Sequence, residues 1–134
     1  MFDLKRRQVV LANSGLPYPI RLRKTDRPVD TETAPETIEL AGVPLGSFPG
    51  STYDELALDL QAGDLFVFCS DGVFEANDLL LREFGSARLM KVLEEVRDLP
   101  AKQMVDAIFA AVAEFRGEAQ PNDDMTAVAV KITA

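Results

Sequence analysis

Two acidic side chains stand where a carboxylate can do chemistry, beside apolar runs that are expected to be buried strands. Asp71 follows the run 65–69 after one serine, and Asp123 precedes the run 125–132. Side chains at the ends of buried strands are held rigidly enough to form a site. If the two strands are neighbours, the carboxylates converge, and converging carboxylates either titrate abnormally or bind a hard metal ion.

The chain has no histidine and a single cysteine, Cys69. These two facts limit the catalytic mechanisms and metal sites that are possible. Without histidine there is no Ser-His-Asp triad, no Cys-His dyad and no histidine-liganded zinc site. A cysteine-dependent phosphatase needs an arginine six residues after its cysteine, and that position holds Glu75. Cys69 is therefore interpreted as a small buried apolar side chain. A metal held by the aspartates would be Mg²⁺ or Mn²⁺, bound through oxygen.

Both acidic segments also have an interpretation as simple turns. Asp, Asn and Gly are common in turns because their side chains bond to nearby backbone or permit unusual backbone angles. Neither Asp71-Gly72 nor Asn122-Asp123-Asp124 is specific by itself. Spacing alone therefore leaves the turn and the metal site open as alternatives.

The apolar pattern predicts the strands that position these residues. Alternating or continuous apolar runs indicate strands at 8–13, 18–23, 37–40, 55–60, 65–69 and 125–132. Turn residues at 14–17 and 61–64 predict hairpins that join the strands on either side of them. The runs 65–69 and 125–132 are apolar on both faces, which predicts central strands. The polar segment 24–35 contains two prolines and is expected to be a mobile loop.

Two amphipathic helices are expected between the last two strands. The first begins after Ser86 as its N-cap, and the second begins at Pro100 and stops at Gly117. Strands followed by two helices and a returning strand show no alternation of strand and helix. The predicted fold class is therefore α+β, with helices packed on an antiparallel sheet. A length of 134 residues allows one domain.

The charge is strongly acidic overall and unevenly distributed. The formal net charge is −8, and residues 1–30 carry seven basic and three acidic side chains, which leaves −12 for the rest. An acidic chain lacks the basic footprint of a nucleic-acid-binding protein. No apolar run approaches the roughly 20 residues of a membrane span, and no signal peptide is evident. We therefore expect a cytoplasmic protein that binds no nucleic acid and does not span a membrane.

Five short segments are more specific together than any one of them alone. In chain order they are Leu11 to Gly15, Gly42 to Gly46, Gly63 to Leu65 with Ser70 to Ala76, Glu83 to Gly85, and Asn122 to Thr126. This series resembles the bacterial SpoIIE-like branch of the PPM family, the metal-dependent serine/threonine phosphatases of type 2C.

The resemblance implies a fold and a reaction. The family fold is a sandwich of two antiparallel sheets with helices on both outer faces, and two Mn²⁺ or Mg²⁺ ions between the sheets activate water against a phosphoserine or phosphothreonine. By motif, Asp71 and Asp123 are implied metal ligands, and Asp124 is implied to support them without contacting the metal. Glu75 and Asn13 match positions interpreted as structural support. The implied partner is a phosphorylated regulatory protein of the anti-anti-sigma type in a sigma-factor switch.

The chain also departs from the family pattern. The family's first acidic motif, an Asp-Gly whose aspartate bridges both metals, lies upstream of the segment matched by 11–15, whereas Asp3 here is followed by Leu4. Leu16 occupies the position of the family's usual histidine. The resemblance thus implies that residues 1–134 are the C-terminal portion of one phosphatase domain, incomplete at its N-terminal side and with little or no activity alone.

An alternative function is a non-catalytic phosphatase-like module for binding or dimerisation. Missing sheet neighbours leave unpaired strand edges and exposed apolar faces, which favour pairing with another chain. Self-association is therefore expected under either interpretation.

Overall fold

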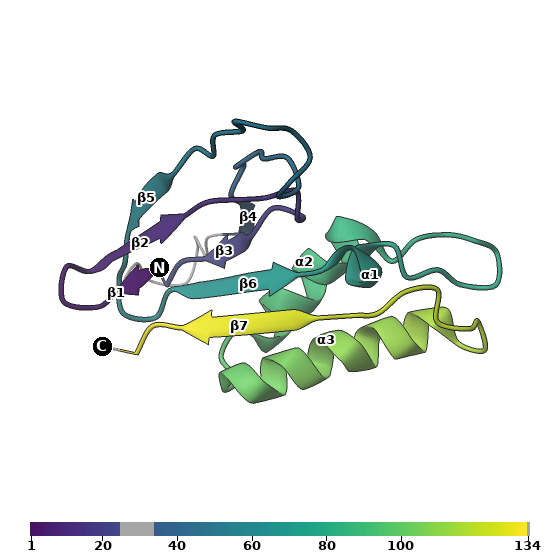
Figure 1. The fold of residues 1–134 in the computed structure, drawn as a ribbon. Helices are drawn as coiled ribbons and strands as arrows, with labels where there is room; N and C mark the ends of the chain where they lie inside the picture. The colour runs from purple at the N-terminus through teal and green to yellow at the C-terminus, as the bar shows by residue number, and fades with distance from the viewer. Residues whose placement is uncertain (25–33, 134) are drawn as a thin grey trace.

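The structure contains two facing β-sheets, and helices pack behind one of them (Figure 1). The structure, a computed structural model, describes residues 1–24 and 34–133. All strand pairs in both sheets are antiparallel. The prediction of an α+β antiparallel sandwich is confirmed. Most of the loop expected at 24–35 lies outside the described residues.

The strands divide into a three-stranded and a four-stranded sheet. The first sheet has the order β1-β2-β5, with β1 (Phe2–Asp3), β2 (Gln8–Leu11) and β5 (Leu56–Asp59). The second has the order β4-β3-β6-β7, with β4 (Glu36–Thr37), β3 (Ile20–Leu22), β6 (Leu65–Cys69) and β7 (Ala127–Lys131).

The helices of the described residues pack against the second sheet. They are α1 (Asp71–Phe74), α2 (Gly85–Val96) and α3 (Ala101–Arg116). Helix α3 follows Pro100 and is capped by Gly117, as predicted. Helix α2 begins one residue before the expected cap, Ser86, because buried Phe84 fixes the start of the helix through its N–H, which donates to the Ala76 carbonyl at 2.7 Å.

Both predicted hairpins are wrong. β2 and β3 belong to different sheets, and so do β5 and β6, so the turns at 14–17 and 61–64 carry the chain from one sheet to the other. The burial pattern gives the physical reason. β3 is buried at every residue because it lies between helices and the facing sheet, whereas β2 alternates between buried and partly exposed residues.

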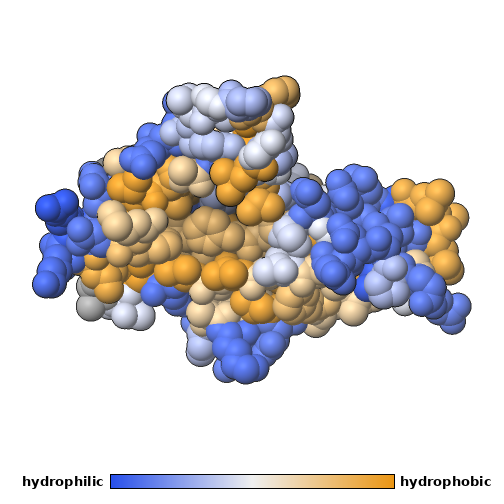
Figure 2. Space-filling model, in the orientation of Figure 1, coloured by the Kyte–Doolittle hydropathy of each residue, from blue (hydrophilic) through white to orange (hydrophobic). Residues whose placement is uncertain are grey.

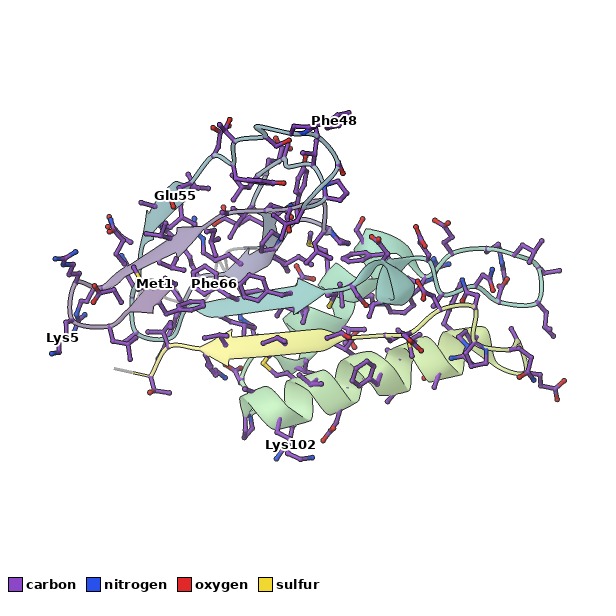
Figure 3. The ribbon with its side chains drawn as sticks, viewed as in Figure 1. Met1, Lys5, Phe48, Glu55, Phe66 and Lys102 are labelled. Atoms are coloured by element: carbon purple, nitrogen blue, oxygen red, sulfur yellow. The ribbon has the colours of Figure 1, made fainter. Side chains whose placement is uncertain are left out.

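β6 is central, as predicted, because β3 and β7 flank it. Its side chains alternate between two cores. Val67 and Cys69 pack with the helices, and Phe66 packs between the sheets, where its ring meets that of Phe2 edge-on at 5.5 Å between centroids (Figure 3).

The prediction that the last strand is central is wrong. β7 is shorter than the expected strand and lies at the end of the four-stranded sheet. It is apolar on both faces because Ala127 and Ala129 pack with the helical core while Val130 packs with the core between the sheets. Apolar pattern thus reports which faces are covered and carries no information about whether both edges are paired.

Candidate functional site

The pairing of β6 with β7 brings the two acidic segments to one end of the second sheet. Cys69 lies opposite Ala127. Beyond this pair, the Ser70 N–H donates to the Thr126 carbonyl and the Thr126 N–H donates to Ser70 Oγ, each at 2.9 Å. Asp71 therefore begins α1 next to the loop that holds Asp123, and the neighbouring strands that convergence requires are present.

Gly72 holds this loop at backbone distance. A Cβ atom at Gly72 would lie 2.0 Å from the Asp124 carbonyl oxygen and 3.5 Å from Asp123 Cβ, so only glycine fits here. On the far side of α1, Asn122 Nδ2 donates to the Glu75 carbonyl at 3.0 Å. A close backbone approach at the start of α1 and the Asn122 side-chain bond at its end thus fix the 122–124 segment against it.

The acidic side chains are solvent-exposed at Asp71, Asp123 and Asp124. One Asp123 oxygen accepts a hydrogen bond from the Asp124 N–H at 2.7 Å, which orients that carboxylate. Within residues 1–24 and 34–133, no three Asp, Glu, Cys or His side chains are clustered closely enough to form a metal cage. Mg²⁺ is commonly bound through one or two carboxylates with several waters. The two aspartates fit such an oxygen-liganded ion in kind and number.

Glu75 contributes backbone rather than side-chain contacts to this region. Its N–H donates to the Asp71 carbonyl at 2.9 Å and closes α1, while its carbonyl accepts the Asn122 bond. Its side chain is exposed. These contacts are of the kind that a supporting role at Glu75 requires.

Asn13 joins the turn after β2 to a distant segment. Its Nδ2 donates to the carbonyls of Leu16 and Leu40 at 2.9 and 2.8 Å, and its Oδ1 accepts from the Leu16 N–H at 3.0 Å. The side chain is buried. A Cβ atom at Gly42 would lie only 1.7 Å from the Asn13 carbonyl oxygen, so the two backbones touch. Asn13 is thus placed as a brace between the two segments.

An open hollow lies between Asn13 and the acidic end of the second sheet. Its volume is about 380 Å³, and its lining includes Asn13, Gly42 and Asp71. Three of the five segments singled out in the sequence therefore border one space. A fourth is attached through the bond from Phe84 to Ala76, and the fifth through the contact of Asp124 with Gly72.

Beside this hollow lies an apolar cavity that the sequence does not predict. It has a volume of about 390 Å³ between the two sheets, and its lining includes Leu11, Leu16, Phe68, Cys69 and Val128. Figure 2 shows hydrophobic residues gathered on this face of the molecule. Burial raises the pKa of the Cys69 thiol to about 11, so the thiol stays protonated at neutral pH. The cavity combines strands of both sheets, and no short-range pattern reports such a contact.

The comparison with protein families then decides the assignment. The family model described as "Stage II sporulation protein E (SpoIIE)" matches residues 1–133. The chain belongs to the SpoIIE family. No curated protein matches this SpoIIE-family chain at a significant level.

Solved phosphatase domains share the fold of this SpoIIE-family chain. The SiaA-PP2C domain of Pseudomonas aeruginosa matches with a TM-score of 0.76 and 19% identity, over 97% of this chain and 48% of that one. The RsbU and RsbW domains of Rv1364c from Mycobacterium tuberculosis match with a TM-score of 0.75 and 21% identity, over 99% and 35% of the two chains. The PP2C phosphatase domain and regulatory fragment of SpoIIE from Bacillus subtilis match with a TM-score of 0.71 and 22% identity, over 98% and 36%.

The SpoIIE-family chain thus spans about half of the SiaA-PP2C domain and about a third of the other two structures. Asp3 does not join the acidic segments at the end of the second sheet. That residue lies in β1, at the end of the sandwich away from α1 (Figure 1), and its carboxylate accepts the Arg6 N–H at 3.0 Å. No helix in the described residues is long and apolar enough to cross a membrane.

Proposed function

We propose that this chain is the C-terminal portion of a metal-dependent protein serine/threonine phosphatase domain, in which Asp71 and Asp123 bind Mn²⁺ or Mg²⁺. The observation that carries the proposal is the joining of the two acidic segments, by the β6–β7 ladder and by the contact of Gly72 with Asp124. Asp71 and Asp123 are 52 residues apart in the sequence. If the two acidic segments were simple turns, they would not need to lie next to each other.

The residues of the proposed metal site would have different roles. Bound metal ions would activate water and offset the charge of the phosphoryl group. Asp71 and Asp123 would hold the metal, while the Asp124 N–H orients the Asp123 carboxylate. Glu75 and Asn13 would keep the surrounding loops in place through the bonds described above. A second metal would need ligands beyond these residues.

The substrate in this proposal is a phosphoserine or phosphothreonine in a regulatory protein of the anti-anti-sigma type. Support comes from family membership and from a similar structure that carries RsbU and RsbW domains in one chain. A cytoplasmic location and self-association belong to the same proposal. The isolated chain is expected to have little or no activity, because a partial site lacks the preorganised electrostatics of the reaction.

A non-catalytic binding or dimerisation module is the second candidate. It is favoured by the exposure of Leu16, which is 61% accessible and lines the apolar cavity at the edge of the acidic hollow. An apolar residue there suits contact with another protein surface better than contact with a phosphate.

Calorimetric titration with Mn²⁺ distinguishes the two candidates. The phosphatase proposal expects saturable binding that Asp71→Ala removes, with no such loss for Asp98→Ala at an exposed site in the turn between α2 and α3. A wild-type chain that takes up no Mn²⁺, or that binds it equally after Asp71→Ala, would leave the binding module as the better account.

A further inference from the structure

A small pocket, the α2 pocket, lies on the helix side of the four-stranded sheet. Its volume is about 240 Å³, and its walls come from the segment 17–20, β4, α1 and α2. The apolar part of the wall includes Ile20, Phe74 and Met90, which all belong to the core between this sheet and the helices. The pocket is at the β4 end of the strand order, opposite β7.

The α2 pocket adjoins the acidic hollow through two shared elements. Pro17 and Tyr18 line both spaces. Helix α1 is the second link, because Asp71 at its start lines the acidic hollow and Phe74 at its end lines the α2 pocket. Residues three apart on a helix are neighbours on its surface. A molecule bound at Asp71 therefore has the α2 pocket next to it, across Tyr18.

Both walls of the α2 pocket are formed in the unbound chain. Tyr18 stands between Pro17 and Pro19, and it is restricted because a residue before proline is held in extended backbone. On the other side, Ser86 and Met90 are four residues apart on α2 and so face the pocket together. A preformed pocket loses little conformational freedom when it binds a ligand.

The size and chemistry of the α2 pocket suit one uncharged side chain. Pockets that enclose a whole small molecule have volumes of about 300–1,000 Å³, and this one is smaller. None of the described residues that line it is charged; Thr37 and Ser86 contribute hydroxyl groups to an otherwise apolar wall. A charged group placed here would lose water without gaining an ionic partner. The occupant that fits is an apolar side chain.

We propose that the α2 pocket binds an apolar side chain of the phosphoprotein substrate, within a few residues of the phosphoserine or phosphothreonine. This inference rests on the proposed phosphatase function. The occupant is part of the substrate because the pocket continues from the acidic hollow, so a chain that extends from a phosphoresidue at Asp71 reaches it past Tyr18. A metal site reads the phosphoryl group alone, whereas this pocket reads the sequence beside it.

An NMR titration with phosphopeptides tests the proposal without requiring turnover. Short peptides carry a central phosphoserine, alanine at the other positions, and one phenylalanine whose position is varied; Mg²⁺ is present throughout. At one position the phenylalanine should lower the dissociation constant roughly tenfold relative to the all-alanine peptide, because its ring leaves water for an apolar site. The same peptide should shift the methyl signal of Met90.

Ser86→Phe fills the α2 pocket from an exposed position on α2 and should remove the preference for phenylalanine. Ala87→Phe is the matched control, since it adds the same ring at the next exposed position, outside the lining. Consecutive helical residues face different directions, so this variant should keep the preference. If circular dichroism shows that Ser86→Phe is unfolded, Thr37→Phe fills the pocket from β4 instead and should also remove the preference.

Failure of the α2 pocket is distinguishable from failure of the phosphatase proposal. If phosphorylated peptides bind better than unphosphorylated ones but phenylalanine has no effect at any position, the pocket proposal alone is overturned. It is also overturned by a preference that survives both Ser86→Phe and Thr37→Phe, or by one that Ala87→Phe removes. Equal affinity of the wild-type chain for phosphorylated and unphosphorylated peptides would overturn the phosphatase proposal, and the pocket proposal with it.

Discussion

At the scale of single residues, the candidate site depends on close backbone approaches rather than on unusual side-chain environments. Asp71 and Asp123 are exposed, and what places them is a glycine that admits the Asp124 carbonyl and a serine that bonds to Thr126. The same device recurs at Gly42 against Asn13. Two pairs of segments in the site thus meet at a glycine, where a side chain as small as a methyl group does not fit.

Gly72→Ala is expected to displace the 122–124 loop. Its new Cβ would sit 2.0 Å from a backbone oxygen that cannot rotate away, so the loop or α1 must move. The loss of stability should be at least about 2 kcal/mol, in the range of overpacked cores. Urea denaturation measures this loss, and Mn²⁺ titration should show weaker binding. An unchanged midpoint with unchanged metal binding would contradict the close approach.

Cys69 is expected to be unreactive in the folded chain. Burial raises its pKa from 9.0 to about 11, so the nucleophilic thiolate is scarce at neutral pH. Alkylation by iodoacetamide at pH 8 should be slow in the native protein and fast in urea. Because the folded pKa is the higher one, the stability from the neutral thiol is complete below pH 9 and is lost as pH rises toward 11. Rapid native alkylation would contradict the burial.

At the scale of elements, long periodic segments are predictable and pairings between sheets are not. The limits of α3 follow from Pro100 and Gly117, and β6 is a central strand as its apolar run indicates. Both hairpin predictions are wrong because a turn motif indicates that the chain reverses, but does not indicate that the two flanking strands hydrogen-bond to each other. The four-residue α1 and the two-residue β1 are too short to show a period at all.

The loop between α1 and α2 presents three leucines to solvent. Leu79, Leu80 and Leu81 are 69%, 72% and 78% exposed. Buried Asp78 holds them by accepting the N–H groups of Leu80 and Arg82 at 2.9 and 3.0 Å. Leu81 has a φ of 60°, a left-handed conformation that is costly for a leucine.

Leu81→Gly is therefore expected to stabilise the chain. Relief of left-handed strain gives about 1–2 kcal/mol, and the greater unfolded-state entropy of glycine offsets about 0.5–1 kcal/mol of it. A net gain of about 1 kcal/mol should raise the melting temperature by a few degrees. Leu80→Gly is the matched control, since its φ is not positive, and it should stabilise nothing. Equal effects of the two variants would argue against strain at Leu81.

Asp78 should make stability depend on pH in the acid range. The hydrogen bond from the Arg82 side chain, at 2.7 Å, is the main reason that the pKa of Asp78 is lowered from 3.8. A lowered folded pKa means that the stabilisation is complete above the unfolded value and is lost as pH falls through the folded one. Thermal melts between pH 2 and 7 should show a smaller dependence for Asp78→Asn than for wild type or for Asp98→Asn. An identical dependence in all three would contradict the Asp78 contribution.

At the scale of the whole molecule, the sequence predicts the sandwich class but not which strands are neighbours in it. The order of strands and helices is enough to indicate an antiparallel α+β fold, and the acidic segments could be located because each adjoins a strongly apolar run. Their convergence depends on β6 being the neighbour of β7, a pairing between residues about 60 positions apart, which only the folded chain reveals.

The central claim is that Asp71 and Asp123 form one metal site, and paramagnetic broadening by Mn²⁺ tests it most directly. Substoichiometric Mn²⁺ is added to the labelled chain and the loss of each backbone amide signal is followed by NMR. The expected result is selective broadening at 70–75 and 122–126, which Asp71→Asn and Asp123→Asn each abolish. Broadening centred on another acidic surface, such as Glu94 and Glu95 of α2, or broadening that survives both substitutions, would contradict the claim.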